Sequence, residues 1–181
     1  MIRLATILFF FGATSLSLFG QQALSDNING RWSVYSEGEW ISLEPSIHEL
    51  GNFDEVGLTF FMQWEQYGII SEKGIIVLEE EFNSIKQLGG GYYLLLNDKK
   101  QQILACWRTD RMELRDVEKA QEIQTNWYTA QIDTTQILIN VSGQKEWILS
   151  DEDEVIESDF NYVYCEIDGV LKLFDPNGNE I

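Results

Sequence analysis

Three stretches of the chain, YYLLLND at 92–98, WYTAQID at 127–133 and YVYCEID at 162–168, follow one another at intervals of 35 residues. Each stretch opens on an aromatic residue and ends on aspartate. A fourth copy, shifted by one residue, runs from Leu58 to Gln63. Self-similarity at a fixed period of this size is the signature of a repeat architecture, so the spacing predicts a tandem repeat of about 35 residues.

A short apolar segment and a glycine turn recur beside these stretches. Four segments with their turn glycines are 32–36 with Gly38, 68–71 with Gly74, 137–140 with Gly143, and 171–175 with Gly178. Glycine takes positive φ at no steric cost, and Pro176 presets φ for a turn at 175–178. These paired segments predict antiparallel β-hairpins, and hence an all-β fold.

The repeat divides the chain into units at 30–63, 64–98, 99–133 and 134–168, with a partial fifth unit at 169–181. One unit of this size cannot bury an apolar face alone, so we expect neighbouring units to stack and share a core. Two architectures fit this expectation. One is an open, twisted stack of hairpins, and the other is a small propeller-like ring whose fifth blade is completed by strand exchange between the termini.

Residues 66–87 resemble a WG repeat. Tyr67 and Gly68 begin a strand, Lys73 and Gly74 form a turn, and the buried aromatic Phe82 begins the next segment. The resemblance extends less closely to 30–63 and 134–168. It implies a β-rich repeat architecture and a scaffolding or binding role, and it supplies no catalytic residues.

The first 20 residues have the pattern of a secretory signal peptide. Arg3 is followed by an apolar run from Leu4 to Phe19, which is short for a bilayer span of roughly 20 residues. Cleavage near Gly20 or Ala23 would leave one β-repeat domain at 21–181, exported to the periplasm or the cell exterior. The alternative is an uncleaved N-terminal anchor.

The composition argues against several functions. A formal charge of -18 repels nucleic acid and anionic lipid, while a hydrophobic fraction of 44% suffices for a packed core. His48 is the one histidine, and the residues around it match no hydrolase motif. We therefore expect a noncatalytic protein without a cofactor.

The cysteines and the acidic runs are expected to be structural. One histidine and two cysteines cannot form a closed tetrahedral metal site, so no metal is predicted. Cys165 is predicted on an inner strand face and Cys106 at a turn entrance, which disfavours a disulfide between them. The acidic runs at 79–81 and 151–154 lack the spacing of a calcium-binding loop and are predicted to be solvated loops.

The aromatic column Tyr92, Trp127 and Tyr162 is the candidate ligand platform, because stacked repeats would align the three rings on one face. The alternative is that these rings are buried in a second core layer. The column and the repeat favour an exported binding or scaffold protein with a protein or glycan partner. The alternatives are an extracellular carbohydrate-active enzyme with paired carboxylates, and an acidic inhibitor of a basic partner.

Overall fold

The structure, a computed structural model, describes residues 24–28, 30–157 and 162–181. These residues form eighteen β-strands in five small antiparallel sheets and include no helix. The predicted all-β fold is therefore confirmed. The predicted signal peptide at 1–20 lies outside the described residues.

The five sheets follow the order of the chain, and each is a simple meander of neighbouring strands. Sheet 1 contains β1 (Leu24–Ile28), β2 (Arg31–Ser36) and β3 (Glu39–Ser42). Sheet 2 contains β4 (Ile47–Leu50), β5 (Leu58–Gln63), β6 (Gln66–Ser71) and β7 (Ile76–Phe82). Sheet 3 contains β8 (Ser84–Gly89), β9 (Tyr92–Leu96), β10 (Gln102–Arg108) and β11 (Arg111–Val117). Sheet 4 contains β12 (Lys119–Gln124), β13 (Trp127–Ile132), β14 (Thr135–Asn140) and β15 (Lys145–Leu149). Sheet 5 contains β16 (Glu154–Glu157), β17 (Val163–Ile167) and β18 (Val170–Phe174).

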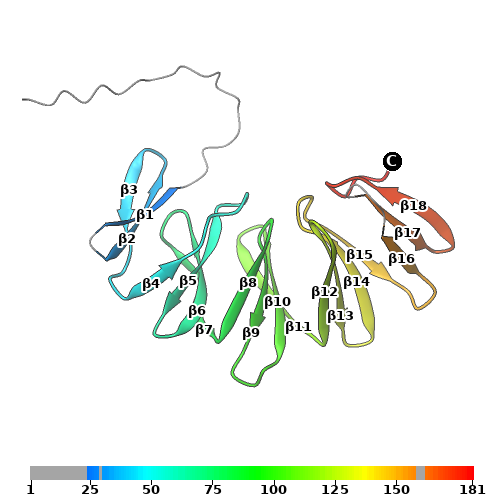
Figure 1. The fold of residues 1–181 in the computed structure, drawn as a ribbon, viewed down its shortest axis with the longest axis horizontal. Coiled ribbons are helices and arrows are strands. Elements are labelled where there is room, and N and C mark those ends of the chain that lie inside the picture. Colours follow the sequence, from blue (N-terminus) through cyan, green and yellow to red (C-terminus); the bar gives the residue numbers. More distant parts are fainter. Residues whose placement is uncertain (1–23, 29, 158–161) are drawn as a thin grey trace, which may run out of the picture.

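The sheets stand along an open arc, with sheet 1 at one end and sheet 5 at the other (Figure 1). In the described parts of the chain, the strands of sheets 1 and 5 pair only within their own sheets. The strand exchange that the ring alternative required therefore does not occur among the described residues. The C-terminal residues instead fold back on sheet 5, where Glu180 forms a β-bridge with Phe174. Of the two predicted architectures, the open stack is the one observed.

The aromatic stretches occupy equivalent strands. They form β5, β9, β13 and β17, which are the second strands of sheets 2 to 5. Their pairing with the third strands is also equivalent, because Tyr128 lies opposite Ile139 in sheet 4 and Val163 lies opposite Phe174 in sheet 5. A four-stranded sheet thus takes two strands from each of two predicted units, as sheet 3 does from 64–98 and 99–133.

Each sheet has a forward face, toward the next sheet in chain order, and a rear face, toward the previous sheet. Equivalent residues on the forward faces are Val34, on β2 of sheet 1, and Ile69, Leu104, Leu138 and Leu173, on the third strands of sheets 2 to 5. The following residues, on the rear faces, are Tyr35, Ile70, Ala105, Ile139 and Phe174. Alternation along a strand therefore sends neighbouring side chains into two different junctions between sheets.

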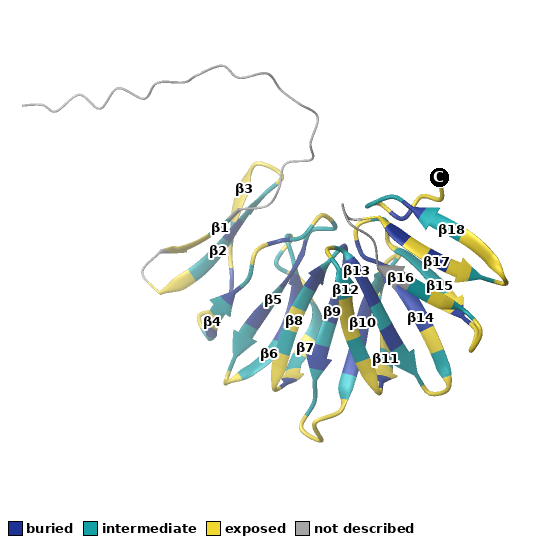
Figure 2. Ribbon diagram, turned by 45° about the vertical axis from the view of Figure 1, so that its right-hand side comes forward, coloured by how far each residue is buried: buried dark blue, intermediate teal, exposed yellow. Residues whose placement is uncertain are grey.

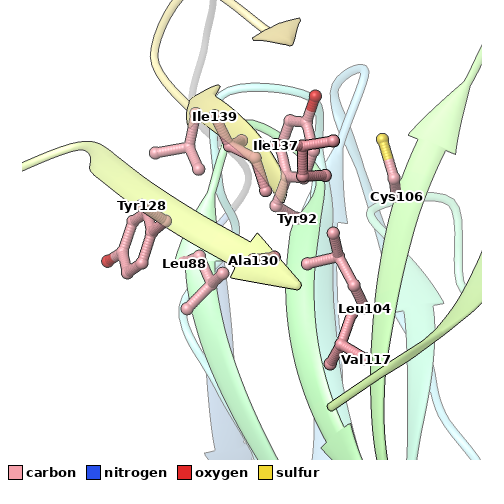
Figure 3. Packing of buried hydrophobic residues seen from close by; sticks show 10 residues of the cluster. Leu88, Tyr92, Leu104, Cys106, Val117, Tyr128, Ala130, Ile137 and Ile139 are labelled. Atoms are coloured by element: carbon pink, nitrogen blue, oxygen red, sulfur yellow. The ribbon is translucent and has the colours of Figure 1, made fainter. Parts of the chain in front are cut away.

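The hydrophobic core consists of four separate clusters, one in each junction between consecutive sheets. Between sheets 3 and 4, Tyr92 and Leu104 from sheet 3 meet Tyr128 and Ile137 from sheet 4 (Figure 3). Sheets 2, 3 and 4 bury residues on both faces, whereas exposed positions are frequent in sheets 1 and 5 (Figure 2).

Two local predictions require correction. Cys106 lies within β10 and is fully buried, not at a turn entrance, because β10 continues to Arg108 and its turn to β11 begins only at Thr109. Glu79, Glu80 and Glu81 belong to the edge strand β7 and not to a loop. An edge strand tolerates such charges because its outer side faces water. Both cysteines are free, and both are buried.

Candidate functional site

The predicted ligand platform does not form an open ladder. Tyr92 and Trp127 are both 0% exposed, and Tyr162 is 36% exposed. Tyr92 packs against sheet 4 and Trp127 against sheet 5, because each lies on the forward face of a sheet that the next sheet covers. The platform is therefore wrong, and burial in a core layer is the correct alternative for these two rings.

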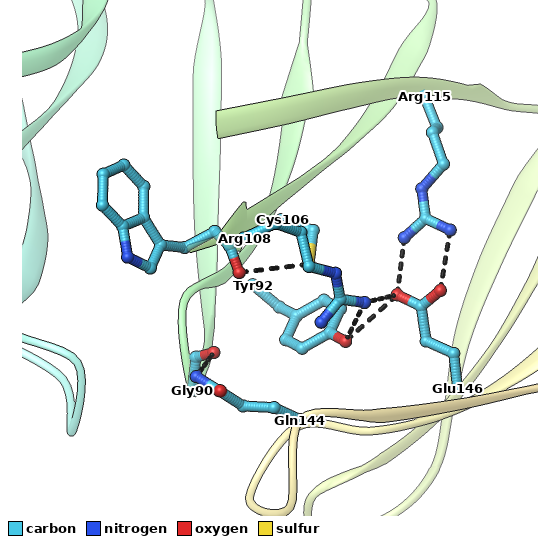
Figure 4. A network of polar contacts seen from close by, with 8 residues as sticks. Gly90, Tyr92, Cys106, Arg108, Arg115, Gln144 and Glu146 are labelled. Carbon is cyan, nitrogen blue, oxygen red and sulfur yellow. Dashed lines mark hydrogen bonds and ion pairs between the residues drawn. The ribbon is translucent and has the colours of Figure 1, made fainter. Parts of the chain in front are cut away.

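Tyr92 instead belongs to a polar cluster between sheets 3 and 4, shown in Figure 4. Arg115 donates two hydrogen bonds to Glu146, from Nη1 to Oε2 at 2.8 Å and from Nη2 to Oε1 at 2.6 Å. Arg108 Nη2 donates to Glu146 Oε1 at 2.6 Å and to the Tyr92 hydroxyl at 2.8 Å. The hydroxyl in turn donates to Glu146 Oε1 at 3.0 Å.

Three strands of sheet 3 supply this cluster, and one strand of sheet 4 completes it. Tyr92 opens β9, Arg108 ends β10 and Arg115 lies within β11, while Glu146 lies in β15 opposite Ile139. The Arg108 guanidinium also lies over the Tyr92 ring, 5.3 Å from its centre, which is a cation–π distance. The cluster therefore links two sheets through side chains far apart in sequence.

Charge pairing and burial fix the protonation states of the cluster. Burial alone would raise the pKa of Glu146, but the hydrogen bonds from Arg115 and the charges of Arg115 and Arg108 lower it below its usual range. Burial, with the nearby Cys106 and Glu146, raises the pKa of Tyr92 far above its usual value. Burial is also the main cause of the raised pKa of Cys106.

Each titratable group of this arrangement is engaged in a structural contact. Glu146 is ionised and held by two guanidinium groups, while Tyr92 and Cys106 are kept neutral. A general base or nucleophile needs the opposite, namely a pKa near the working pH or an activated thiolate. The cluster acts as a polar tie that holds sheets 3 and 4 together.

A second partly buried carboxylate ties sheet 2 to sheet 3. Asp54, in the loop before β5, accepts hydrogen bonds from the Gly91 amide at 2.9 Å and the Tyr93 hydroxyl at 3.3 Å. Its other oxygen accepts from the amides of Val56 and Leu58. Burial raises the pKa of Asp54, although the backbone hydrogen bonds oppose that shift. Asp54 is thus a structural anchor with its hydrogen-bonding capacity in use.

The one histidine lies beside an exposed tryptophan. His48, on β4, is exposed, and its ring stands edge-on to Trp64 with 6.3 Å between ring centres. Trp64 is 68% exposed and has φ of 53° in the turn between β5 and β6. Positive φ is costly for a bulky residue, and an exposed indole gains no burial, so this turn is not optimised for folding.

Sequence reasoning missed Trp64, although the repeat contained a signal. The equivalent hairpin turns of sheets 4 and 5 carry Asp133 and Thr134, or Asp168 and Gly169. Aspartate and glycine suit positive φ, whereas tryptophan does not. Trp64 is therefore a candidate binding residue, because the equivalent turns of sheets 4 and 5 carry small or polar residues.

A groove of about 570 Å³ lies between sheets 3 and 4, at the end where β9 meets β10 and β11 meets β12. Lys100 and Lys119 line it together with Asp116, Glu118 and Asp133. Within the described ranges, no three side chains of histidine, cysteine, aspartate or glutamate come close enough to hold a metal ion. None of the described residues forms a helix that is long and apolar enough to cross a membrane.

The chain matches no protein-family model, and no curated protein shows significant similarity to it. The fold itself defines a class, an open array of antiparallel β-sheets. Neighbouring sheets of the array are joined by apolar clusters and by polar ties.

Proposed function

We propose that this chain is an exported, noncatalytic β-repeat protein, akin to WG repeat proteins, that binds a protein or glycan partner. One observation carries the proposal: Trp64 is 68% exposed in a turn whose backbone disfavours it. Neither the exposure nor the positive φ helps the fold, so the indole is best explained by a contact outside the chain.

The surroundings of Trp64 suit recognition. Its ring lies next to the exposed ring of His48, and the acidic residue Glu65 follows Trp64 in the sequence. An apolar surface therefore adjoins hydrogen-bonding and charged groups. Tryptophan is enriched among residues that dominate binding energy, and aromatic rings give a large contact area with few rotatable bonds. The polar side chains of the two ties, by contrast, hold neighbouring sheets together, which favours a binding role over catalysis.

A titration with two kinds of probe tests this proposal. Oligosaccharides of β-1,4-linked glucose or N-acetylglucosamine serve as glycan probes, and cytochrome c serves as a basic protein probe. We expect Trp64→Ala to weaken binding at least tenfold, the loss of roughly 1.4 kcal/mol or more expected for a central aromatic contact. Ile148→Ala is the matched control, because Ile148 is 74% exposed on β15 and should leave affinity unchanged.

The same measurements separate the alternatives. Release of shorter sugars from the oligosaccharides would support a carbohydrate-active enzyme. Association with cytochrome c that salt abolishes and that Trp64→Ala leaves unchanged would support an acidic inhibitor. No binding to either probe would count against the proposal. Export is tested by fusing residues 1–30 to alkaline phosphatase, which is active only outside the cytoplasm.

A further inference from the structure

The forward face of sheet 5 is more exposed than the forward faces of sheets 1 to 4. Val34, Ile69, Leu104 and Leu138 are all fully buried, because the next sheet covers each of them. Leu173, the equivalent residue of sheet 5, is partly exposed. Its neighbour on the same face, Leu171, is 62% exposed. Sheet 5 therefore keeps apolar residues of an inner sheet on this face, beside Glu154 and Glu166, and none of the described sheets covers them.

The rear faces show the complementary pattern. Ile70, Ala105, Ile139 and Phe174 are buried against the preceding sheet, whereas Tyr35 of sheet 1 is partly exposed. On the same rear face, Trp40 lies opposite Tyr35 and is 53% exposed, with 5.3 Å between the two ring centres. Among the described residues, the first and last sheets thus leave opposite halves of the same interface open.

These outer faces differ from ordinary caps. Repeat proteins need terminal repeats with a polar outer surface to remain soluble, because each inner repeat offers apolar surface on both sides. Here Leu171 and Tyr164 are exposed on the forward face of sheet 5, and Trp40 on the rear face of sheet 1. Exposed aromatic and aliphatic side chains of this kind mark interaction surfaces.

We propose that the chain assembles head to tail, with the forward face of sheet 5 in one copy packed on the rear face of sheet 1 in a second copy. The contact would continue the sheet-to-sheet junction that already occurs four times within the chain. The two surfaces are different, so the contact is heterologous and builds either rings or filaments, according to the curvature of the arc.

Charge sets the conditions for this assembly. Each copy carries a formal charge of -18, so two copies repel one another at low ionic strength. Salt screens that repulsion and leaves the apolar contact in place. Association should therefore become stronger as salt is raised, which is the opposite of an interface held together by ion pairs.

Complementary blocked variants test the proposal. Leu171→Glu blocks the forward face of sheet 5, and Trp40→Glu blocks the rear face of sheet 1. Each variant alone should associate at least tenfold more weakly than wild type in sedimentation equilibrium. A mixture of the two should form a one-to-one dimer, because each variant keeps the face that the other lacks. Both residues are exposed, so both variants should keep the wild-type circular dichroism spectrum.

Ile148→Glu provides the matched control, since Ile148 is an exposed apolar residue on the edge strand β15, outside both faces. It should associate as wild type does. Two results would overturn the proposal. One is wild-type protein that stays monomeric up to about 1 mM in high salt, the weak end of measurable affinity. The other is a Trp40→Glu variant that still dimerises alone, because sheet 5 would then pair with itself.

Discussion

Arg115 and Glu146 join two separate sheets through a two-point ion pair, with hydrogen bonds of 2.8 and 2.6 Å between β11 and β15. Bidentate pairs of this kind are stronger and more directional than single contacts. The side chains of Arg115 and Glu146 are 27% and 20% exposed, so water screens the pair only in part. The pair therefore holds sheet 3 to sheet 4 at their junction.

Glu146→Gln should lower the free energy of unfolding by about 1 to 3 kcal/mol. The substitution removes the negative charge that Arg115 and Arg108 share and leaves two partly buried guanidinium groups facing each other. Urea denaturation followed by tryptophan fluorescence measures the loss. Glu122→Gln is the control, because its ion pair with Lys86 is about half exposed. That change should cost about 0 to 1 kcal/mol, and equal losses in the two variants would contradict the prediction.

The contribution of Glu146 should depend on pH. Its pKa in the folded chain lies below the ordinary value of 4.5, so the ionised form favours folding. That stabilisation is present above about pH 4.5 and is lost as the pH falls through the folded-state pKa. The difference in unfolding free energy between wild type and Glu146→Gln should therefore shrink on acidification. The raised pKa of Asp54 acts in both proteins and cancels in this difference. A difference that stays constant from pH 6 to about pH 3 would contradict the assignment.

Gly90 should be intolerant of any side chain. An added Cβ would lie 1.9 Å from the carbonyl oxygen of Val141, at a backbone φ of +55°. Gly90→Ala should therefore force sheets 3 and 4 apart and cost several times the roughly 1 to 2 kcal/mol of positive φ alone. Gly30→Ala isolates that backbone cost, because Gly30 has φ of +77° and nothing within 4 Å of its added Cβ. Thermal unfolding of the two variants gives the comparison, and similar melting temperatures would show that the junction can open.

Local chemistry made much of the fold predictable. The turn at 175–178 forms as expected, since the Gly178 amide donates to the Asp175 carbonyl at 2.9 Å and Gly178 has positive φ. The segments at 68–71 and 137–140 lie in strands, as expected for residues of high β-propensity that precede a turn. The interval of 35 residues between copies then showed which strands are equivalent in successive sheets.

Long-range relationships were not predictable from these patterns. The partners in the polar tie, Arg108 and Glu146, are 38 residues apart, and no local period connects them. Alternation showed that Trp127 and Tyr128 point to opposite faces, but it could not show that a sheet covers each face. The platform at Tyr92, Trp127 and Tyr162 failed for that reason. Side chains alternate between the two faces of a strand whether one face or both are covered, so alternation alone does not show which face is buried.

Both thiols should be unreactive in the folded protein. Cys106 and Cys165 are free and fully buried, and burial is the main cause that raises the pKa of Cys165 to about 11. A buried, protonated thiol attacks a disulfide reagent slowly, because the thiolate is the reactive form. Without reductant, Ellman's reagent should detect almost no thiol in native protein and two thiols per chain in urea. Cys165→Ser should give one thiol in urea, since Cys106 remains. If wild type in urea shows thiols only after reduction, the two cysteines are bridged and sheets 3 and 5 lie closer than the arc allows.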